Sequence, residues 1–282
     1  MKTQLRRTCL TTLGAGMALG ALALLGASPA SAVVGGRPVA TDAYPWVVSL
    51  VRPGKPTSSF CGGTLVSPTR VVTAAHCPDD ESASSLKVLV GRQRLSDTGG
   101  QVIDVKSVVV PRRKNGSLWR PDVAVLKLAK PVTGIPFPRV ATTAELSALR
   151  EGNAPVKVIG WGVFATSNPN GRFSREAGIA GDRLREGDLT LVPDIECEGL
   201  LGTLYEPRYE VCGGAVGTRV DVACWGDSGG PLVATLPDGA IGLVGVVSGG
   251  TTCGQAGLPG WYGRVDAVRT MILGPGTRWK PF

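Results

Sequence analysis

The sequence predicts an all-β fold of barrels or sandwiches. Short β-rich runs recur between turn signals, helical patterns are few, and 40 glycines and 21 prolines punctuate the 282 residues. Many short strands with such punctuation are typical of these architectures. The expected strands are Pro45–Val51, Gly63–Ser67, Arg70–Ala74, Leu86–Val90, Gln101–Val110, Val123–Leu128, Val156–Trp161, Arg185–Val192, Pro231–Thr235 and Ile241–Ser248.

Three further segments complete the expected architecture. Val265–Leu273 is the best helix candidate, and Gly274-Pro275 would stop it. The segment Lys130–Ala154, rich in Pro, Thr and Ala, is expected to connect two halves of the protein. Phe164–Gly187 is full of Gly, Ser, Asn and Arg, which predicts a long surface loop.

The first 32 residues have the pattern of a signal peptide. Lys2, Arg6 and Arg7 precede an apolar stretch, and small residues lead to an A-x-A cleavage site that ends at Ala32. A membrane anchor is the alternative, but glycines dilute the apolar stretch. Arg6-Arg7 is also compatible with a twin-arginine export signal. We expect residues 1–32 to be removed and the remainder to be secreted without a membrane attachment.

The charge balance is modestly basic. Removing the 32 residues and their three positive charges from a chain of 282 residues and charge +8 leaves 250 residues and +5. That length suits one large all-β domain or two small ones. The one dense basic cluster is Arg112, Arg113, Lys114 and Arg120, and interleaved proline and glycine predict a solvated loop there. We expect no nucleic-acid partner.

Six of the seven cysteines would survive signal-peptide cleavage. An even number in an exported chain predicts disulfides, but six cysteines allow fifteen connectivities, and the sequence alone does not choose among them. No C-x-x-C pair occurs. A redox or zinc motif therefore has little support.

His76 is the only histidine, so any general-base chemistry by an imidazole must use it. The segment Gly226–Gly230 has the G-x-S-x-G spacing of an α/β-hydrolase elbow, but that fold needs a histidine after the serine. A subtilisin order starting at Asp42 would place a helix at Gly229-Gly230-Pro231, which is poor helix material. Zinc sites built on paired histidines are excluded too. The order His, Asp, Ser survives.

Several motifs then follow one another along the chain. They are Val33-Val34-Gly35-Gly36, Pro45-Trp46-Val47-Val48-Ser49-Leu50, Cys61-Gly62-Gly63, Thr73-Ala74-Ala75-His76-Cys77, Asp122-Val123-Ala124-Val125-Leu126-Lys127-Leu128, Gly160-Trp161-Gly162, Cys224 to Pro231 and Pro259-Gly260-Trp261-Tyr262. Each is weak alone, but the succession is specific. It resembles the chymotrypsin family of secreted, trypsin-like serine endopeptidases, of the bacterial type.

The resemblance covers nearly all of Val33–Val268 and implies a more definite fold. Two packed antiparallel β-barrels with a short C-terminal helix are expected, with the active site between the barrels. The first barrel would span residues 33–140 and carry His76 and Asp122. The second would span residues 141–282 with the terminal helix, and would carry Ser228 and the specificity pocket.

The same resemblance implies a catalytic triad. Ser228 would be the nucleophile, His76 the base that accepts its proton, and Asp122 the carboxylate that orients the imidazole. Ser248 would donate a hydrogen bond to Asp122. A core histidine is the alternative for His76, and a strand-end turn residue for Asp122. Other acids in plausible stretches are Asp79, Asp80, Asp97 and Asp104.

The residues around Ser228 have implied roles as well. The N–H groups of Gly226 and Ser228 would form an oxyanion hole, where Gly226 permits a turn that a side chain would obstruct. Asp227 would bind the ammonium of a new N-terminus at Val33. Because the A-x-A site ends at Ala32, signal peptidase alone would create that ammonium. Export and activation would then be one event, without a separate zymogen.

The resemblance also implies three disulfides. The expected pairs are Cys61–Cys77, Cys197–Cys212 and Cys224–Cys253. The first would tether the turn that bears His76, and the last would brace the walls of the specificity pocket. No metal or cofactor is expected; one acid between Gly91 and Gln101 does not make a calcium site.

Two positions depart from the family pattern. Val222 falls at the pocket floor, where trypsins carry aspartate, Gly250 and Gly260 fall on the pocket walls, and Ser248 is the fourth expected pocket residue. An open apolar pocket predicts cleavage after medium or large apolar residues; a one-residue shift to Asp221 would instead predict cleavage after Arg or Lys. Gly249 stands where the family usually has tryptophan, a ring that Trp119, Trp225 or Trp261 would have to replace.

Two function classes remain at the level of sequence. The first is a secreted, monomeric serine endopeptidase acting on protein or peptide substrates. The second is a catalytically silent family member that binds a partner through the loop from Arg112 to Arg120. The intact triad, the oxyanion glycines and the Val-Val-Gly-Gly segment favour the enzyme.

Overall fold

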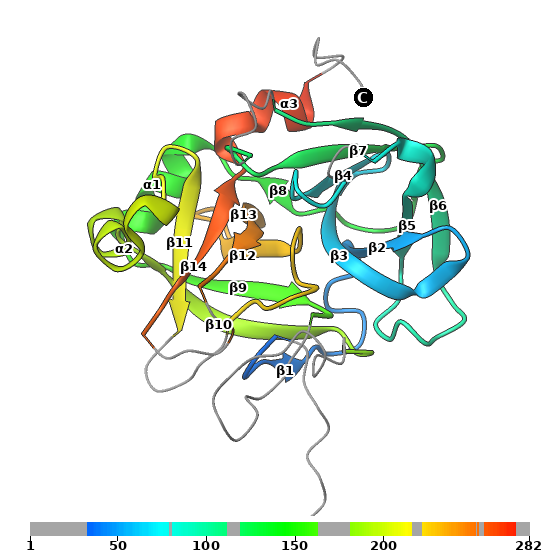
Figure 1. The fold of residues 1–282 in the computed structure, drawn as a ribbon, viewed down its shortest axis with the longest axis horizontal. Helices are drawn as coiled ribbons and strands as arrows, with labels where there is room; N and C mark the ends of the chain where they lie inside the picture. Colours follow the sequence, from blue (N-terminus) through cyan, green and yellow to red (C-terminus); the bar gives the residue numbers. More distant parts are fainter. Residues whose placement is uncertain are drawn as a thin grey trace, which may run out of the picture.

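Two closed six-stranded antiparallel β-barrels form the protein (Figure 1). The structure, a computed structural model, describes residues 33–78, 81–111, 119–162, 181–215, 222–251, 253 and 257–274. The predicted signal peptide and most of the basic cluster lie outside the described residues. The two-barrel fold expected from the sequence is confirmed.

The first barrel closes in the order β2-β3-β4-β7-β6-β5. Its strands carry many buried Val and Leu side chains, such as Val88, Leu89 and Val90. The strands are β2 (Val47–Arg52), β3 (Lys55–Ser67), β4 (Arg70–Thr73), β5 (Lys87–Val90), β6 (Gln101–Val109) and β7 (Ala124–Leu128).

The second barrel closes in the order β9-β10-β11-β14-β13-β12, with β9 also pairing β12. Its strands are β9 (Pro155–Gly160), β10 (Arg185–Val192), β11 (Glu210–Ala215), β12 (Pro231–Thr235), β13 (Ile241–Gly249) and β14 (Gly260–Arg264). Two short strands attach to its outside. β1 (Arg37–Pro38) pairs with β10, and β8 (Arg139–Val140) runs parallel to β13.

In the described part of the chain, three short α-helices lie outside the barrels. α1 (Thr143–Glu151) begins with a capping box between Thr142 and Glu145, and α2 (Asp194–Leu201) follows β10. α3 (Arg269–Leu273) continues a 3₁₀ turn, η4 (Asp266–Val268). Among the described residues, the remaining 3₁₀ turns are η1 (Ala83–Ser85) and η3 (Gly202–Leu204). None of the described helices is long and apolar enough to cross a membrane.

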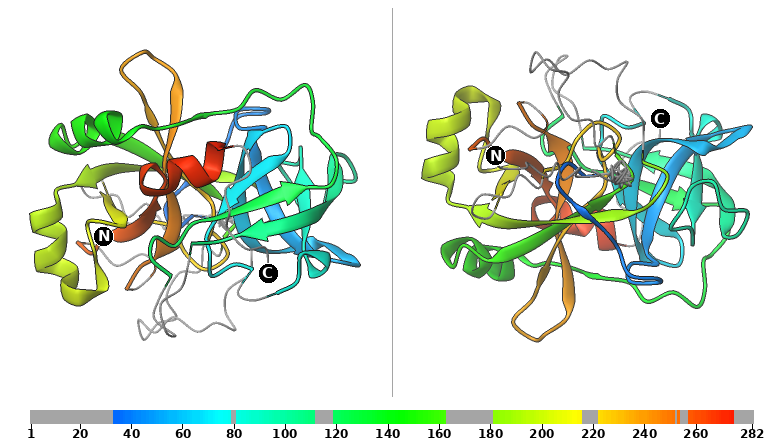
Figure 2. Two further views of the ribbon diagram at one scale, coloured as in Figure 1. Left: turned by 90° about the horizontal axis from the view of Figure 1, so that it is seen from above. Right: turned by 90° about the horizontal axis from the view of Figure 1, so that it is seen from below.

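Both ends of the described chain attach to the barrel that is distant in sequence. Val33 is buried in the core of the second barrel. At the other end, Arg70 of β4 donates hydrogen bonds to the carbonyls of Ile272 and Gly274, 2.6 and 2.8 Å long. Figure 2 shows α3, in red, lying over the junction of the barrels. The division at residue 140 stays a prediction.

Every expected strand overlaps an observed one, and β10 and β12 have the expected bounds. The expected connector Lys130–Ala154 contains β8 and α1, and Thr142 and Glu145 form the capping box that begins this helix. The predicted loop Phe164–Gly187 extends three residues too far, because Arg185–Gly187 belong to β10. Residues 163–180 of that loop lie outside the described part.

Candidate active site

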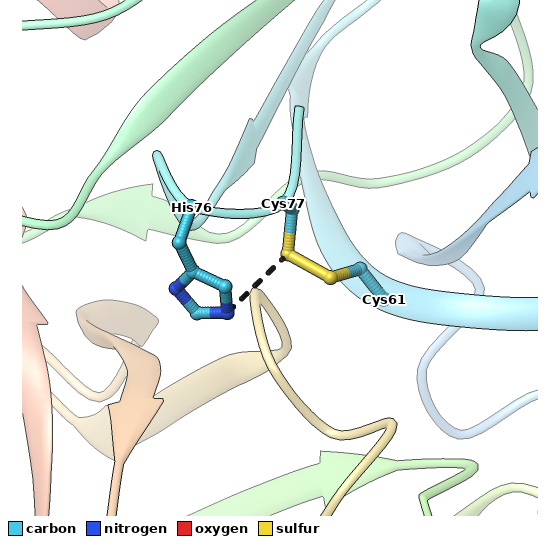
Figure 3. Close-up of side chains that lie close together, drawn as sticks. All are labelled: Cys61, His76 and Cys77. Carbon is cyan, nitrogen blue, oxygen red and sulfur yellow. Dashed lines mark hydrogen bonds between the residues drawn. A yellow bond between two sulfur atoms is a disulfide. The ribbon is translucent and has the colours of Figure 1, made fainter. Parts of the chain in front are cut away.

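His76 lies in the turn that follows β4. The Cys61–Cys77 disulfide, with an S–S distance of 1.99 Å, ties this turn to β3. Figure 3 shows the imidazole beside that bridge, with Nε2 4.0 Å from Cys77 Sγ. The side chain is 38% exposed. The ring is therefore anchored on one side and open to a reactant on another, which a histidine sealed in a core would not be.

Asp122 meets His76 from the segment that leads into β7. The main-chain N–H of His76 donates to Asp122 Oδ1 at 2.9 Å, and Nδ1 of the imidazole lies 2.7 Å from Oδ2. Ser248 Oγ donates to the same Oδ2 at 2.7 Å. The Asp122 side chain is only 7% exposed. A buried carboxylate that accepts Nδ1–H leaves Nε2 of the neutral ring as a proton acceptor.

Ser228 sits in a tight turn between the two barrels. Asp227 N–H donates to the Cys224 carbonyl at 2.9 Å, and Gly62 N–H of β3 donates to the Ser228 carbonyl at 2.7 Å. Gly229 has φ +78°, and a Cβ there would collide with Thr73 Oγ1 and the Gly62 carbonyl. Glycine at 229 therefore brings the serine turn against the residues that lead to His76.

The backbone beside Ser228 is shaped for an anion. Gly226 has φ +92°, a conformation that favours glycine. Within the described residues, no hydrogen bond uses the N–H of Gly226 or of Ser228 as donor. Two such N–H groups next to a nucleophile can stabilise a developing oxyanion.

Asp227 is fully buried beneath this turn. Its carboxylate accepts hydrogen bonds from Gly162 N–H at 2.8 Å and Cys224 N–H at 2.9 Å. Burial raises the pKa of Asp227 to about 7, and the two N–H donors oppose that rise. A buried cation beside this carboxylate would stabilise its charged form.

Val33 enters the same barrel next to Val222. The Val33 side chain is fully buried. Val34 and Val222 exchange two main-chain hydrogen bonds, each 3.1 Å long. The segment expected to become the mature N-terminus is therefore fixed against the segment that leads to Asp227.

The structure describes Val222, Ser248, Gly250 and Gly260, the residues expected to form the specificity pocket. Val222 is 7% exposed, so an apolar side chain occupies the expected floor. A Cβ at Gly250 would meet no atom within 4 Å, which leaves that wall open. A Cβ at Gly260 would lie 3.3 Å from the Gly249 carbonyl. Asp221, the alternative acid, lies outside the described residues.

The structure separates the three tryptophans considered as replacements at Gly249. Trp119 is 8% exposed in a core cluster, and Trp225 is 47% exposed. Trp261 pairs with Gly249 across β13 and β14. Its indole fills the space that a side chain at 249 would occupy. All three tryptophans were candidates from the sequence, but the strand register places only Trp261 directly opposite Gly249.

An ionic group beside Asp122 was not anticipated. Glu210 of β11 is 3% exposed and accepts a hydrogen bond from Glu206 N–H at 2.7 Å. Arg120 Nε lies 4.0 Å from its Oε1. Burial raises the pKa of Glu210, and the charge of Asp122 adds to the rise. The one signal in the sequence for this Glu210–Arg120 group is that Arg120 lies two residues before Asp122.

The structure contains the three cysteine pairs Cys61–Cys77, Cys197–Cys212 and Cys224–Cys253. These are the pairs that the resemblance implied. Cys61, Cys77 and His76 place potential metal ligands within 4.8 Å of one another. Both sulfurs belong to the disulfide, so no thiolate remains to bind a metal.

Comparisons with known proteins show the family to which the chain belongs. The Trypsin family model matches residues 33–272. Trypsin of Saccharopolyspora erythraea is 34% identical over 245 residues, covering 86% of this chain and 96% of its own. Hypodermin-B of Hypoderma lineatum is 35% identical over 246 residues, 85% of this chain and 86% of its own.

A third relative, the trypsin-like protease of Streptomyces glaucescens, is 33% identical over 259 residues, 88% of this chain and 87% of its own. Bacterial and insect relatives are thus similarly close in identity, and the bacterial type expected from the sequence has only weak support.

Proposed function

Because this chain belongs to the trypsin family of serine endopeptidases, we propose that Ser228, His76 and Asp122 are its catalytic triad. The observation that carries the proposal is the double attachment of His76 to Asp122, at 2.9 and 2.7 Å. It orients Nε2 as the acceptor for the Ser228 hydroxyl proton, which makes the serine oxygen a competent nucleophile.

The chemistry follows in two steps. Ser228 Oγ attacks the peptide carbonyl carbon while His76 Nε2 takes the hydroxyl proton, and the N–H groups of Gly226 and Ser228 receive the oxyanion. The imidazolium returns the proton to the leaving amine, which yields an acyl-enzyme. Water activated by His76 then releases the acid and regenerates Ser228.

The pocket supports a preference for apolar residues before the scissile bond. An Arg or Lys side chain would bring a charge to a floor made by Val222, whose side chain offers no compensating carboxylate. Two relatives are named Trypsin and trypsin-like protease, so cleavage after Arg or Lys is the competing specificity. Val222 argues against it.

Activation is proposed to accompany export. The buried Asp227, the buried Val33 and the paired Val34 and Val222 support an ion pair between a free Val33 ammonium and Asp227. Removal of residues 1–32 would create that ammonium. Three disulfides support secretion, because such bonds persist in oxidising compartments. N-terminal sequencing of active secreted protein tests this; a start upstream of Val33 contradicts it.

Covalent labelling tests the triad directly. A fluorophosphonate probe should label the wild-type protein at Ser228, and the Ser228→Ala variant should remain unlabelled. Ser84→Ala, at an exposed serine of η1, is a matched control that removes a hydroxyl away from the site and should be labelled like the wild type. A folded wild-type protein that takes no label at Ser228 would favour the catalytically silent, partner-binding alternative.

A further inference from the structure

Gly249 and Trp261 share one space at the end of two paired strands. They are directly opposite in the register of β13 and β14. An ideal Cβ on Gly249 would lie 2.5 Å from Cε2 and 2.8 Å from Nε1 of the Trp261 indole. Real Cβ atoms do not approach other atoms so closely. The indole therefore covers Gly249, and only glycine leaves room for it.

This shared space lies beside the catalytic centre. Ser248, the residue before Gly249, is bonded to Asp122 at 2.7 Å. Gly250, the residue after it, has open space around its Cα and is one of the residues proposed for the specificity pocket. One residue of a strand spans about 3.3 Å. The indole therefore lies opposite the residue between Ser248 and Gly250, which a substrate chain would pass if it entered the proposed pocket.

The indole has firm support on its other side. Trp261 is half-buried and packs with Val192 against a cluster formed by Cys197, Leu201, Tyr205 and Cys212. The Cys197–Cys212 disulfide lies within that cluster. A ring held in this way presents a fixed apolar surface, which loses little conformational entropy when a ligand binds.

We propose that Trp261 is a specificity-determining residue of the proposed endopeptidase. Its indole forms the wall against which an apolar substrate side chain packs, upstream of the residue that enters the pocket. Gly249 is the partner that makes room for the ring. This inference rests on the proposed function, because it assigns a role to Trp261 in binding the substrate of the same site.

Two matched peptides test the proposal. Both carry the preferred residue before the scissile bond, and the three preceding residues are leucines in one and glycines in the other. The wild-type protein should prefer the leucine peptide in kcat/KM. Trp261→Ala should reduce this preference about tenfold, mainly through KM, because one apolar contact surface is lost. Tyr209→Ala, which removes another half-buried aromatic ring of the same barrel, should leave the preference unchanged.

Gly249→Ala provides a second test. The added methyl group collides with the indole, so it should lower the melting temperature in the wild-type background and lower it less in the Trp261→Ala background. It should also reduce the leucine preference by displacing the ring. Additive melting-temperature changes, or an unchanged preference in active Trp261→Ala, would overturn the inference alone. A folded wild-type protein that hydrolyses neither peptide would overturn the proposed function and the inference with it.

Discussion

Asp122 holds His76 by both its main chain and its ring. Oδ1 accepts the His76 N–H at 2.9 Å, while Oδ2 lies 2.7 Å from Nδ1. Two attachments fix both the position of the turn and the rotation of the imidazole. The carboxylate thereby selects the tautomer with the proton on Nδ1, in which Nε2 is an acceptor.

Asp122→Asn should preserve the fold and remove most of the activity. An amide NH₂ in place of Oδ2 would face Nδ1 as a donor, which favours the tautomer with the proton on Nε2. We expect kcat to fall by about four orders of magnitude. Peptidase assays and fluorophosphonate labelling rates measure the loss. Asp97→Asn, at an exposed acid, is the control; equal losses in both variants would remove Asp122 from the triad.

The pKa of Asp227 gives the precursor a specific pH dependence. In the full-length chain burial raises this pKa from 3.8 to about 7. Between these values the folded state keeps a proton that the unfolded state has released, so the free energy of unfolding falls as pH rises from about 4 to about 7. The total loss should be up to about 4 kcal/mol. Urea unfolding at several pH values measures it.

The matched variant for this test is Asp227→Asn, which removes the titration and should flatten the curve over the same interval. The form that begins at Val33 should also lose less stability across it, because the buried ammonium stabilises the charged carboxylate. If full-length wild type and Asp227→Asn show the same slope, the titrating group is another residue.

The Cys61–Cys77 disulfide should contribute to stability and to the placement of His76. Its ends are 16 residues apart, and closing such a loop in the unfolded chain stabilises the fold by about 3 kcal/mol. Cys61→Ala/Cys77→Ala should lose about that much in urea unfolding and should also lose turnover, because Cys77 adjoins His76.

The other short bridge separates these two effects. Cys197–Cys212 has a separation of 15 residues and joins α2 to β11. Removing it should cost a similar free energy of unfolding, with a smaller loss of turnover on a short ester. Equal losses of turnover in the two double variants would mean that the first bridge acts only through global stability.

The local pattern of apolar and turn residues explains which strands could be predicted from the sequence. β10 alternates buried and half-buried residues over its whole length, and β12 is a compact apolar run, so both were predicted with the observed bounds. β11 and β14 were missed because Gly213, Gly214, Gly260 and Gly263 resemble turn residues. In the barrel these glycines lie against backbone, Tyr262 or neighbouring side chains, where larger residues would meet close contacts.

The candidate site was also predictable only where chain order or local pattern identified a residue. His76 could be assigned from its uniqueness and its order before Asp122 and Ser228, since chain order survives without coordinates. The sequence could not select Trp261 over Trp119 and Trp225, because that choice depends on the register of β13 against β14. The bulge between Val247 and Gly249 sets that register, and no local pattern marks it.

The proposed place of Val222 at the pocket floor makes substrate choice the decisive measurement. Its side chain is 7% exposed and apolar, so the wild-type protein should cleave a peptide panel after medium or large apolar residues. Val222→Asp should shift the ratio of kcat/KM for Arg over apolar substrates upward by at least about a hundredfold, since a buried carboxylate gains most from a cationic partner.

Val222→Asn is the matched control. The asparagine side chain is polar and similar in volume to that of aspartate but carries no charge, so it should not create the preference for Arg. The hydrogen bonds between Val34 and Val222 use main-chain atoms, so both variants can keep them. The new carboxylate should titrate at a raised pKa, since burial disfavours its charged form; cleavage after Arg should therefore increase with pH. A wild-type protein that cleaves mainly after Arg or Lys would place the recognising acid at Asp221 and refute the role of Val222.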